Sequence, residues 1–348
     1  MEGLKMLKTL NKYSVFAKKR SLIAFFAILF LIFSAGCKEK ANSLEPARKS
    51  RQGSIKNNAE RIIKDALSDP SPQIRAKAAE AVAEVRLRQL MPEVQKLLRD
   101  DFVPVRFAAA LAIGNMEYYL ARSNLERLLV IGDENTQLAA AYGLYKLGYK
   151  QYLENIKTAV TSSDQTLRAN AVVLLGKTGD KSVLSLLYWA KDDDFSEPRV
   201  RYQATEAIAK LGDETIVPKL WTMLISKFVD NKIIGVRAMG ALGTREAIEV
   251  LLTKLDDDIL EVQLAAAEQL GMLGDDAGQE IVISVFEKPV IDPTDKDARE
   301  RVMVLAALAI GRIDNQAVTG YLPRLIEDES KLVRLAAAQA ALISKTVR

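Results

Sequence analysis

The stretch that decides the fold reads DFVPVRFAAALAIG and occupies residues 101–114. It runs from an acidic turn to an apolar residue and an arginine, and small residues follow at helical spacing. This arrangement, an anchor residue with a small residue three positions later, recurs nine times at spacings of 26 to 40 residues, most often 31. Such a period predicts a stacked-repeat solenoid. The anchors are Arg75, Arg106, Gln137, Arg168, Arg201, Arg237, Gln263, Met303 and Arg334, and the small residues are Ala78, Ala109, Ala140, Ala171, Ala204, Gly240, Ala266, Ala306 and Ala337.

Each unit carries the signals of two helices. Leu90, Val94 and Leu97 are spaced three and four positions apart, which places them on one face of a first helix. An Asp-rich turn follows in most units, and because Asp and Ser cap helix N-termini, we expect a second helix to begin there. The expected fold is an all-α solenoid of about nine helical-hairpin repeats over residues 59–348. Five glycines fall where second helices are expected to end, namely Gly114, Gly148, Gly176, Gly212 and Gly274.

The repeated residues also suggest a family. The pattern Asp-x-x-x-Val-Arg-x-x-Ala-Ala-x-Ala-Ile-Gly in residues 101–114 resembles HEAT-like repeats of the short type first described in phycobilisome lyases. The resemblance extends over the nine units. It implies a binding scaffold whose second helices line the concave side, and it leaves the activity open, because a fold does not fix a function.

The N-terminus is a different kind of sequence. Six basic residues precede an apolar run, Ser21–Phe33, that ends at Ser34-Ala35-Gly36-Cys37. This order is typical of a secretory signal peptide, and the run is shorter than the about 20 residues that span a bilayer. The residues before Cys37, the only cysteine, resemble the bacterial lipoprotein box, which implies lipidation of Cys37; an uncleaved signal anchor is the alternative. We therefore expect a signal peptide over 1–36 and a lipidated tether over 37–58.

Charge is distributed unevenly along the chain. The whole sequence has a net charge of +4, whereas residues 59–348 hold 37 basic and 42 acidic residues, a net charge of −5. An acidic solenoid disfavours nucleic acid as a partner, since phosphate contacts need clustered Lys and Arg. Residues 37–58 carry a net charge of +4 and no hydrophobic periodicity, which predicts a flexible tether.

The expected groove is lined by the fifth residue after each anchor. The central units are richest in apolar groups there, which favours a protein or peptide partner; alternatively, their aromatic side chains fill gaps between repeats. The insert Lys288–Arg299 is a second candidate contact loop. The stripe consists of Glu80, Leu111, Tyr142, Val173, Glu206, Leu242, Glu268, Leu308 and Gln339, and the candidate partner-binding residues are Phe107, Leu111, Tyr142, Tyr145, Val173, Tyr202 and Glu206.

The arginine anchors are interpreted as structural. Each lies near the Asp of its own turn and that of an adjacent unit, so Asp–Arg pairs are expected to form a ladder between repeats. Gln137, Gln263 and Met303 interrupt this ladder. The expected members are Arg75, Arg106, Arg168, Arg201, Arg237 and Arg334.

Catalysis finds little support in the sequence. The chain has no histidine, which excludes Ser–His and Cys–His nucleophiles and His-based metal sites. The acidic clusters 192–194 and 256–258 lack the spacing of a known calcium loop and are interpreted as turns. We expect no enzyme, no cofactor and no metal.

The expected function is a scaffold that binds protein or peptide partners and is anchored by an N-terminal lipid. Its expected place is the bacterial cell envelope, facing the periplasm or the exterior. A bilin lyase-like enzyme and a peptidoglycan or small-ligand receptor are the alternatives.

Overall fold

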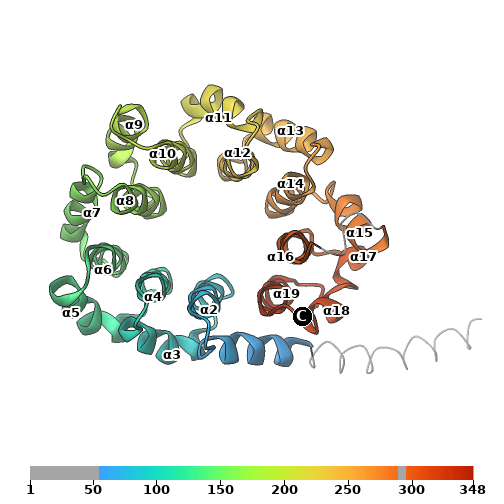
Figure 1. Ribbon diagram of the computed structural model, residues 1–348, viewed down its shortest axis with the longest axis horizontal. Helices are drawn as coiled ribbons and strands as arrows, with labels where there is room; N and C mark the ends of the chain where they lie inside the picture. The colour runs from blue at the N-terminus through green and yellow to red at the C-terminus, as the bar shows by residue number, and fades with distance from the viewer. Residues whose placement is uncertain (1–54, 289–294, 348) are drawn as a thin grey trace, which may run out of the picture. The chain divides into compact units, whose positions relative to one another are not determined.

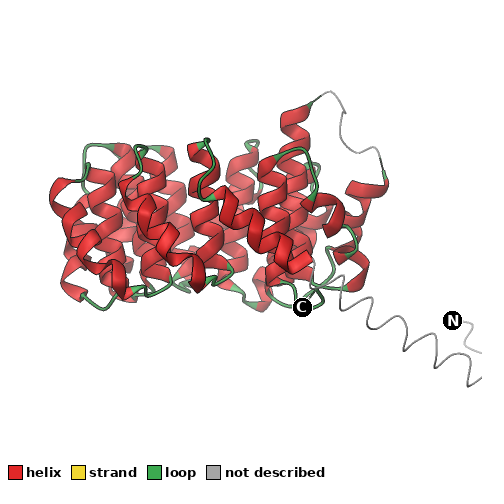
Figure 2. Cartoon of the chain, turned by 90° about the horizontal axis from the view of Figure 1, so that it is seen from below, coloured by secondary structure: helices red, strands yellow, loops and turns green. Residues whose placement is uncertain are grey.

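The computed structural model describes residues 55–288 and 295–347, and every regular element in these ranges is a helix (Figure 2). The helices belong to one compact unit that spans Gln52–Arg348. The predicted signal peptide and Cys37 lie outside the described residues. The first described helix covers 55–66, so it already includes residues 55–58, which the sequence assigns to the tether. None of the helices described is long and apolar enough to cross a bilayer.

Nine helices form an inner layer (Figure 1). They begin after the predicted turns. Asp133, for example, accepts a hydrogen bond from the Thr136 N–H at the start of its helix, as a capping residue does. The sequence prediction of nine second helices is confirmed. They are α2 (Pro72–Glu84), α4 (Val103–Asn115), α6 (Glu134–Lys146), α8 (Gln165–Thr178), α10 (Pro198–Lys210), α12 (Val229–Leu242), α14 (Leu260–Met272), α16 (Lys296–Ile313) and α19 (Lys331–Ile343).

The first helices of the units form an outer layer around them (Figure 1). Each is shorter than most inner helices and often starts with a single tight turn. Besides the helix at 55–66, the layer comprises α3 (Met91–Lys96), α5 (Arg122–Ile131), α7 (Leu153–Ala159), α9 (Leu184–Asp192), α11 (Val217–Leu224), α13 (Arg245–Thr253), α15 (Gln279–Glu287), α17 (Gln316–Thr319) and α18 (Leu322–Ile326).

Small residues allow the inner helices to approach one another. All eight alanines predicted for this role are fully buried. The ninth small residue, Gly240, lies against Gln269 of the next inner helix, where an added Cβ would come within 2.8 Å of the Gln269 Cβ. The predicted use of these positions in close helix packing is confirmed.

The glycines divide into two groups. Gly148, Gly212 and Gly274 have φ values of 98°, 75° and 86° and end their helices as predicted. The prediction is wrong for Gly114 and Gly176, which lie inside α4 and α8. A Cβ on Gly176 would lie 2.8 Å from the Ala207 Cα in α10, so this glycine serves close packing between units.

The last unit contacts the first. α19 packs against α2, and one apolar core includes buried residues of both units (Figure 1). Lys331 Nζ donates to the Asp69 carboxylate at 2.6 Å, and Arg312 forms an ion pair with Glu84. We call this contact, formed by α2, α19 and the two ion pairs, the seam. Because of it, the described helices close into a ring.

Candidate functional site

The arginine ladder joins units along one edge of the ring. Arg75 pairs with Asp100, Arg106 with Asp133, and Arg168 with Asp193, each with 2.7 Å between the nitrogen and the carboxylate oxygen. These guanidinium groups also donate to main-chain carbonyls of their own turns. The side-chain amides of Gln137 and Gln263 make the same hydrogen bond to a main-chain carbonyl but no ion pair. A glutamine can therefore replace arginine at an anchor position.

The ladder differs from the prediction at four anchors. In the unit of Met303, which was expected to interrupt the ladder, Arg299 pairs with Asp328. Arg201 and Arg334 donate mainly to carbonyls of their own turns, and the carboxylate of Asp194 is 4.0 Å from Arg201. Arg237 has no rung. Its predicted place is taken by Lys232, five residues earlier, whose Nζ lies 2.9 Å from Asp257.

The ladder carboxylates of Asp100, Asp257 and Asp328 are held ionised. Burial alone would raise the pKa of Asp257, but hydrogen bonds from the Lys232 Nζ and the Ile259 N–H outweigh it, so the pKa lies below its ordinary value. The same balance lowers the pKa values of Asp100 and Asp328. At neutral pH these carboxylates are therefore negatively charged, and their ion pairs hold neighbouring units together.

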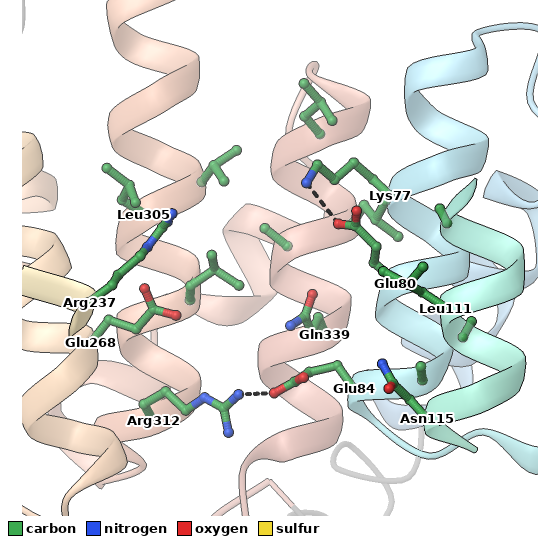
Figure 3. A pocket seen from close by; sticks show the side chains of 18 of the residues that line it. Lys77, Glu80, Glu84, Leu111, Asn115, Arg237, Glu268, Leu305, Arg312 and Gln339 are labelled. Carbon is green, nitrogen blue, oxygen red and sulfur yellow. Dashed lines mark hydrogen bonds and ion pairs between the residues drawn. The ribbon is translucent and has the colours of Figure 1, made fainter. Parts of the chain in front are cut away.

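A cavity of about 940 Å³ occupies the inner side of the ring, which we call the lumen (Figure 3). Helices α2, α4, α8, α12, α14, α16 and α19 line it, so it draws residues from both sides of the seam. Its walls are partly apolar, through residues such as Leu111, Leu305 and Leu308. Five residues of the predicted stripe lie there, namely Glu80, Leu111, Glu268, Leu308 and Gln339.

The predicted aromatic part of the site is wrong. Tyr142 and Tyr145 are buried, at 1% and 5% exposure, and neither faces the lumen. Tyr142 Oη donates to Asn115 Oδ1 at 2.7 Å, and burial raises the pKa of its hydroxyl. These side chains fill the space between repeats, as the alternative interpretation had it.

The other predicted residues divide as follows. Leu111 lines the lumen, whereas Phe107 and Tyr202 are partly buried and pack against the core. Val173 is partly buried. Glu206 Oε1 accepts from Lys210 Nζ at 2.6 Å. Of this set, Leu111 alone is among the residues that line the cavity.

Sequence reasoning missed a second tier of lumen residues. They lie four positions after stripe residues, one helical turn further along the same helix face. The spacing was therefore a usable signal. These residues are Glu84, Asn115, Lys177, Met272 and Arg312.

The charges in the lumen are only partly paired. Five basic residues and three acidic residues line it. Glu84 pairs with Arg312 and Lys77 with Glu80 (Figure 3). The basic surplus distinguishes the lumen from the acidic solenoid around it. Its charged residues are Lys77, Arg86, Lys177, Arg237, Arg312, Glu80, Glu84 and Glu268.

Four of these charges have neither an ion pair nor a side-chain hydrogen bond within the described ranges: Arg86, Lys177, Arg237 and Glu268. Glu268 Oε2 is buried, and burial raises the pKa of this carboxyl although Arg237 and Arg312 oppose the shift. Lys177 is open to solvent in the lumen, yet the ring walls surround it. The surrounding walls desolvate its ammonium, and this desolvation, followed by the positive charge of Lys210, lowers the pKa of Lys177.

Two further predictions concern loops. Residues 289–294 of the predicted contact loop lie outside the described residues, and Lys296–Arg299 form the first turn of α16. In the acidic turns, Asp193 and Asp257 bind the cations of the ladder. Across the described ranges, no group of three or more Cys, Asp or Glu side chains is placed to hold a metal ion.

Comparison with known families agrees with this architecture. The model of HEAT repeats matches residues 60–144 and 153–231. The matched residues are HEAT repeats, and the fold of the described residues is that of an all-α HEAT-repeat solenoid. Solenoids of this type commonly bind proteins, and the match extends from the first unit, which includes α2, to the start of α12.

The solenoid is similar to two curated proteins and to one solved structure. Protein YibA of Escherichia coli (strain K12) is 30% identical over 177 residues, which cover 49% of this chain and 61% of YibA. The chain thus matches about three fifths of the length of that relative. Integrator complex subunit 4 of Mus musculus is 23% identical over 242 residues, 65% of this chain and 22% of that protein.

The solved structure is the complex of CpcE and CpcF of phycocyanin lyase from Nostoc sp. PCC7120. It has 19% sequence identity and a TM-score of 0.43, and the alignment covers 70% of this chain and 92% of that one.

Proposed function

We propose that this solenoid is a scaffold that holds an extended polypeptide segment of a partner in its lumen. The observation that carries the proposal is the contact of α19 with α2, which closes the ring. A concave face that returns on itself admits only what fits within the ring. A cavity of about 940 Å³ suits a ligand-sized object or a few residues of extended chain.

The lining supports a peptide ligand. Leu111, Leu305 and Leu308 offer apolar contacts for side chains. Asn115 and Gln339 bring carboxamide groups that donate to and accept from a peptide main chain (Figure 3). This mixture of apolar walls and a few polar groups is typical of peptide and ligand sites.

We also propose that the scaffold is tethered in a bacterial cell envelope, facing the periplasm or the exterior. The basic residues, short apolar run and Cys37 of the N-terminus support a lipoprotein signal. The absence of histidine from the sequence supports a binding role rather than an enzymatic one.

A small-ligand receptor, for example for a peptidoglycan fragment, is the second candidate function. The unpaired charges in the lumen favour it, because polar groups converging in a partly apolar cavity also suit a compact charged molecule.

Photocrosslinking tests the scaffold proposal. A photoreactive phenylalanine analogue replaces Leu308 in the lumen or, as the control, Val130 on the outer helix α5, which is 79% exposed. We expect a polypeptide adduct from intact cells at Leu308 and none at Val130, with the adduct mapping to one short segment of the partner. Adducts free of polypeptide at Leu308 would favour the small-ligand receptor.

The anchor has its own test. Cys37→Ser should leave an unprocessed precursor that incorporates no labelled fatty acid. Unchanged labelling and unchanged mature size would refute lipidation at Cys37.

A further inference from the structure

Arg237 and Glu268 lie next to each other in the lumen without forming an ion pair (Figure 3). Arg237 projects from α12 toward Leu305 of α16, and Glu268 projects from α14 into the lumen beside it. Each keeps its hydrogen-bonding groups free within the described ranges. A donor fork and a carboxylate acceptor are therefore available side by side, next to an apolar wall.

The free oxygen of Glu268 is the more informative of the two. A buried acceptor without a partner costs folding free energy, because water no longer satisfies it. Arg237 is exposed and water can hydrate it, whereas Glu268 Oε2 is shielded from solvent. Unsatisfied buried groups are uncommon in folded proteins, and one that faces a cavity is a candidate contact for a ligand donor.

Charge narrows the class of ligand. The five basic and three acidic residues of the lumen favour an anionic group over the basic tether of the chain itself. A cleft with a net positive charge between low-dielectric walls concentrates anions. Arg237 presents a planar fork that matches a carboxylate in bidentate geometry.

We propose that the lumen recognises the free carboxyl terminus of the partner segment. Arg237 binds the terminal carboxylate, the Glu268 carboxylate turns to accept a main-chain N–H of the same segment, and Leu305 contacts the last side chain, which is apolar. Lys177 adds to the positive field that draws the terminus in. This assignment rests on the proposed function, since it specifies which part of the partner enters the lumen.

Matched peptide libraries test the assignment. N-acetylated hexapeptides with five randomised positions and a final leucine are prepared as free acids and as carboxyamides. Equilibrium dialysis against the purified full chain, quantified by mass spectrometry, should retain the free acids at least about tenfold better, the loss expected for one charge-assisted hydrogen bond. Equal retention of the two libraries would overturn the carboxylate assignment and leave the scaffold proposal standing. Retention of neither would overturn both.

Variants place the effect at Arg237. Arg237→Gln should abolish the preference for free acids, whereas Arg245→Gln, the same charge change on the outer helix α13, should preserve it. Arg237→Lys keeps the charge and loses the fork, and it should retain part of the preference. A preference that survives in both Arg237 variants would contradict the assignment.

Glu268 gives a second, independent readout. Glu268→Leu should weaken retention of free acids about tenfold, the effect of one lost bond to a charged acceptor. Glu268→Gln keeps an acceptor oxygen and should retain most of the binding. Because it removes a buried unpaired charge, it should also raise the midpoint of thermal unfolding. A Glu268→Leu variant that binds as well as the wild type would refute the role of Glu268.

Discussion

Neighbouring units meet in two ways in this ring: at junctions formed along the chain and at the seam between its two ends. At junctions, glycines lie against the next inner helix, as Gly311 does against Ala340 of α19, and Leu342 occupies the equivalent position of the last unit. The rung residues Arg168 and Asp193 are buried, with side-chain exposures of 7% and 13%.

One of the two ion pairs at the seam is clearly more solvated than that rung. Its cation is Lys331, with a side-chain exposure of 51%, paired with Asp69. Exposed pairs contribute far less than buried ones, because water screens them and the lysine loses side-chain entropy. Inner helices pack side by side both at the junctions and at the seam. Because its Lys331–Asp69 ion pair is more solvated, we expect the seam to be the weaker contact and to open first.

Deleting a whole unit, Arg106–Thr136, should have the largest effect on the seam. In an open solenoid this deletion would shorten the array and preserve its stacking. In a ring, eight units cannot close with the curvature set by nine, so the seam should part. We expect a loss of at least about 3 kcal/mol, since several apolar side chains become exposed at about 1.5–3 kcal/mol each. Small-angle scattering should show a larger radius of gyration despite the shorter chain. A smaller radius would mean that the eight units close again.

A buried junction rung should cost the next largest amount. Asp193→Asn leaves the buried guanidinium of Arg168 without its countercharge, and we expect a loss of about 3 kcal/mol in urea denaturation. Asp194→Asn is the matched control, because its side chain is fully exposed, and should change stability by less than about 0.5 kcal/mol. Equal effects would show that the rung carries no special stability.

Close packing at a junction sharpens the contrast further. A Cβ at Gly311 would lie 2.7 Å from the Ala340 Cα, so Gly311→Val should cost about 1–3 kcal/mol through overpacking. Leu342→Met, at the equivalent position of the last unit, should cost less than about 1.5 kcal/mol. Thermal unfolding of the two variants provides the measurement, and a costlier Leu342→Met would reverse the ranking of the two positions.

The seam ion pair should give the smallest effect, and one that depends on pH. Burial alone would raise the pKa of Asp69, but hydrogen bonds from Lys331 and the Ser71 N–H hold it below its ordinary value of 3.8. The ionised carboxylate therefore stabilises the fold above that value, and this stability is lost as pH falls through the lower pKa of the folded state.

Asp69→Asn should accordingly destabilise by less than about 1 kcal/mol at pH 7. The difference from wild type should shrink with added salt and disappear in acid, once Asp69 is protonated in both states. Urea titrations at several pH values measure it. A difference that persists at low pH would point to lost hydrogen bonds instead of lost charge.

The sequence predicted what local periodicity determines. The nine units, the starts of the inner helices and the buried alanines all follow from residues within one unit, and the structure confirms them. Ring closure was not predictable in this way, because it depends on small rotations between units that accumulate over the whole array.

The site was predicted in part for the same reason. Glu268 and Leu308 were found because their place in the repeat sets the helix face they occupy. Arg237 was missed because α12 uses Lys232 for its rung, which releases the arginine into the lumen. Tyr142 was misplaced because a bulky side chain in the stripe can turn between two helices and bury its ring.

The seam also constrains how such a protein changes over generations. Tandem arrays gain and lose units readily through recombination between similar stretches of gene, and an open solenoid tolerates the resulting change in length. Here, the contact of α19 with α2 leads us to expect that the number of units is itself under selection, because an array that cannot close again after gaining or losing one unit loses the enclosed lumen. Point substitutions that retune individual units remain the accessible route to a different ligand.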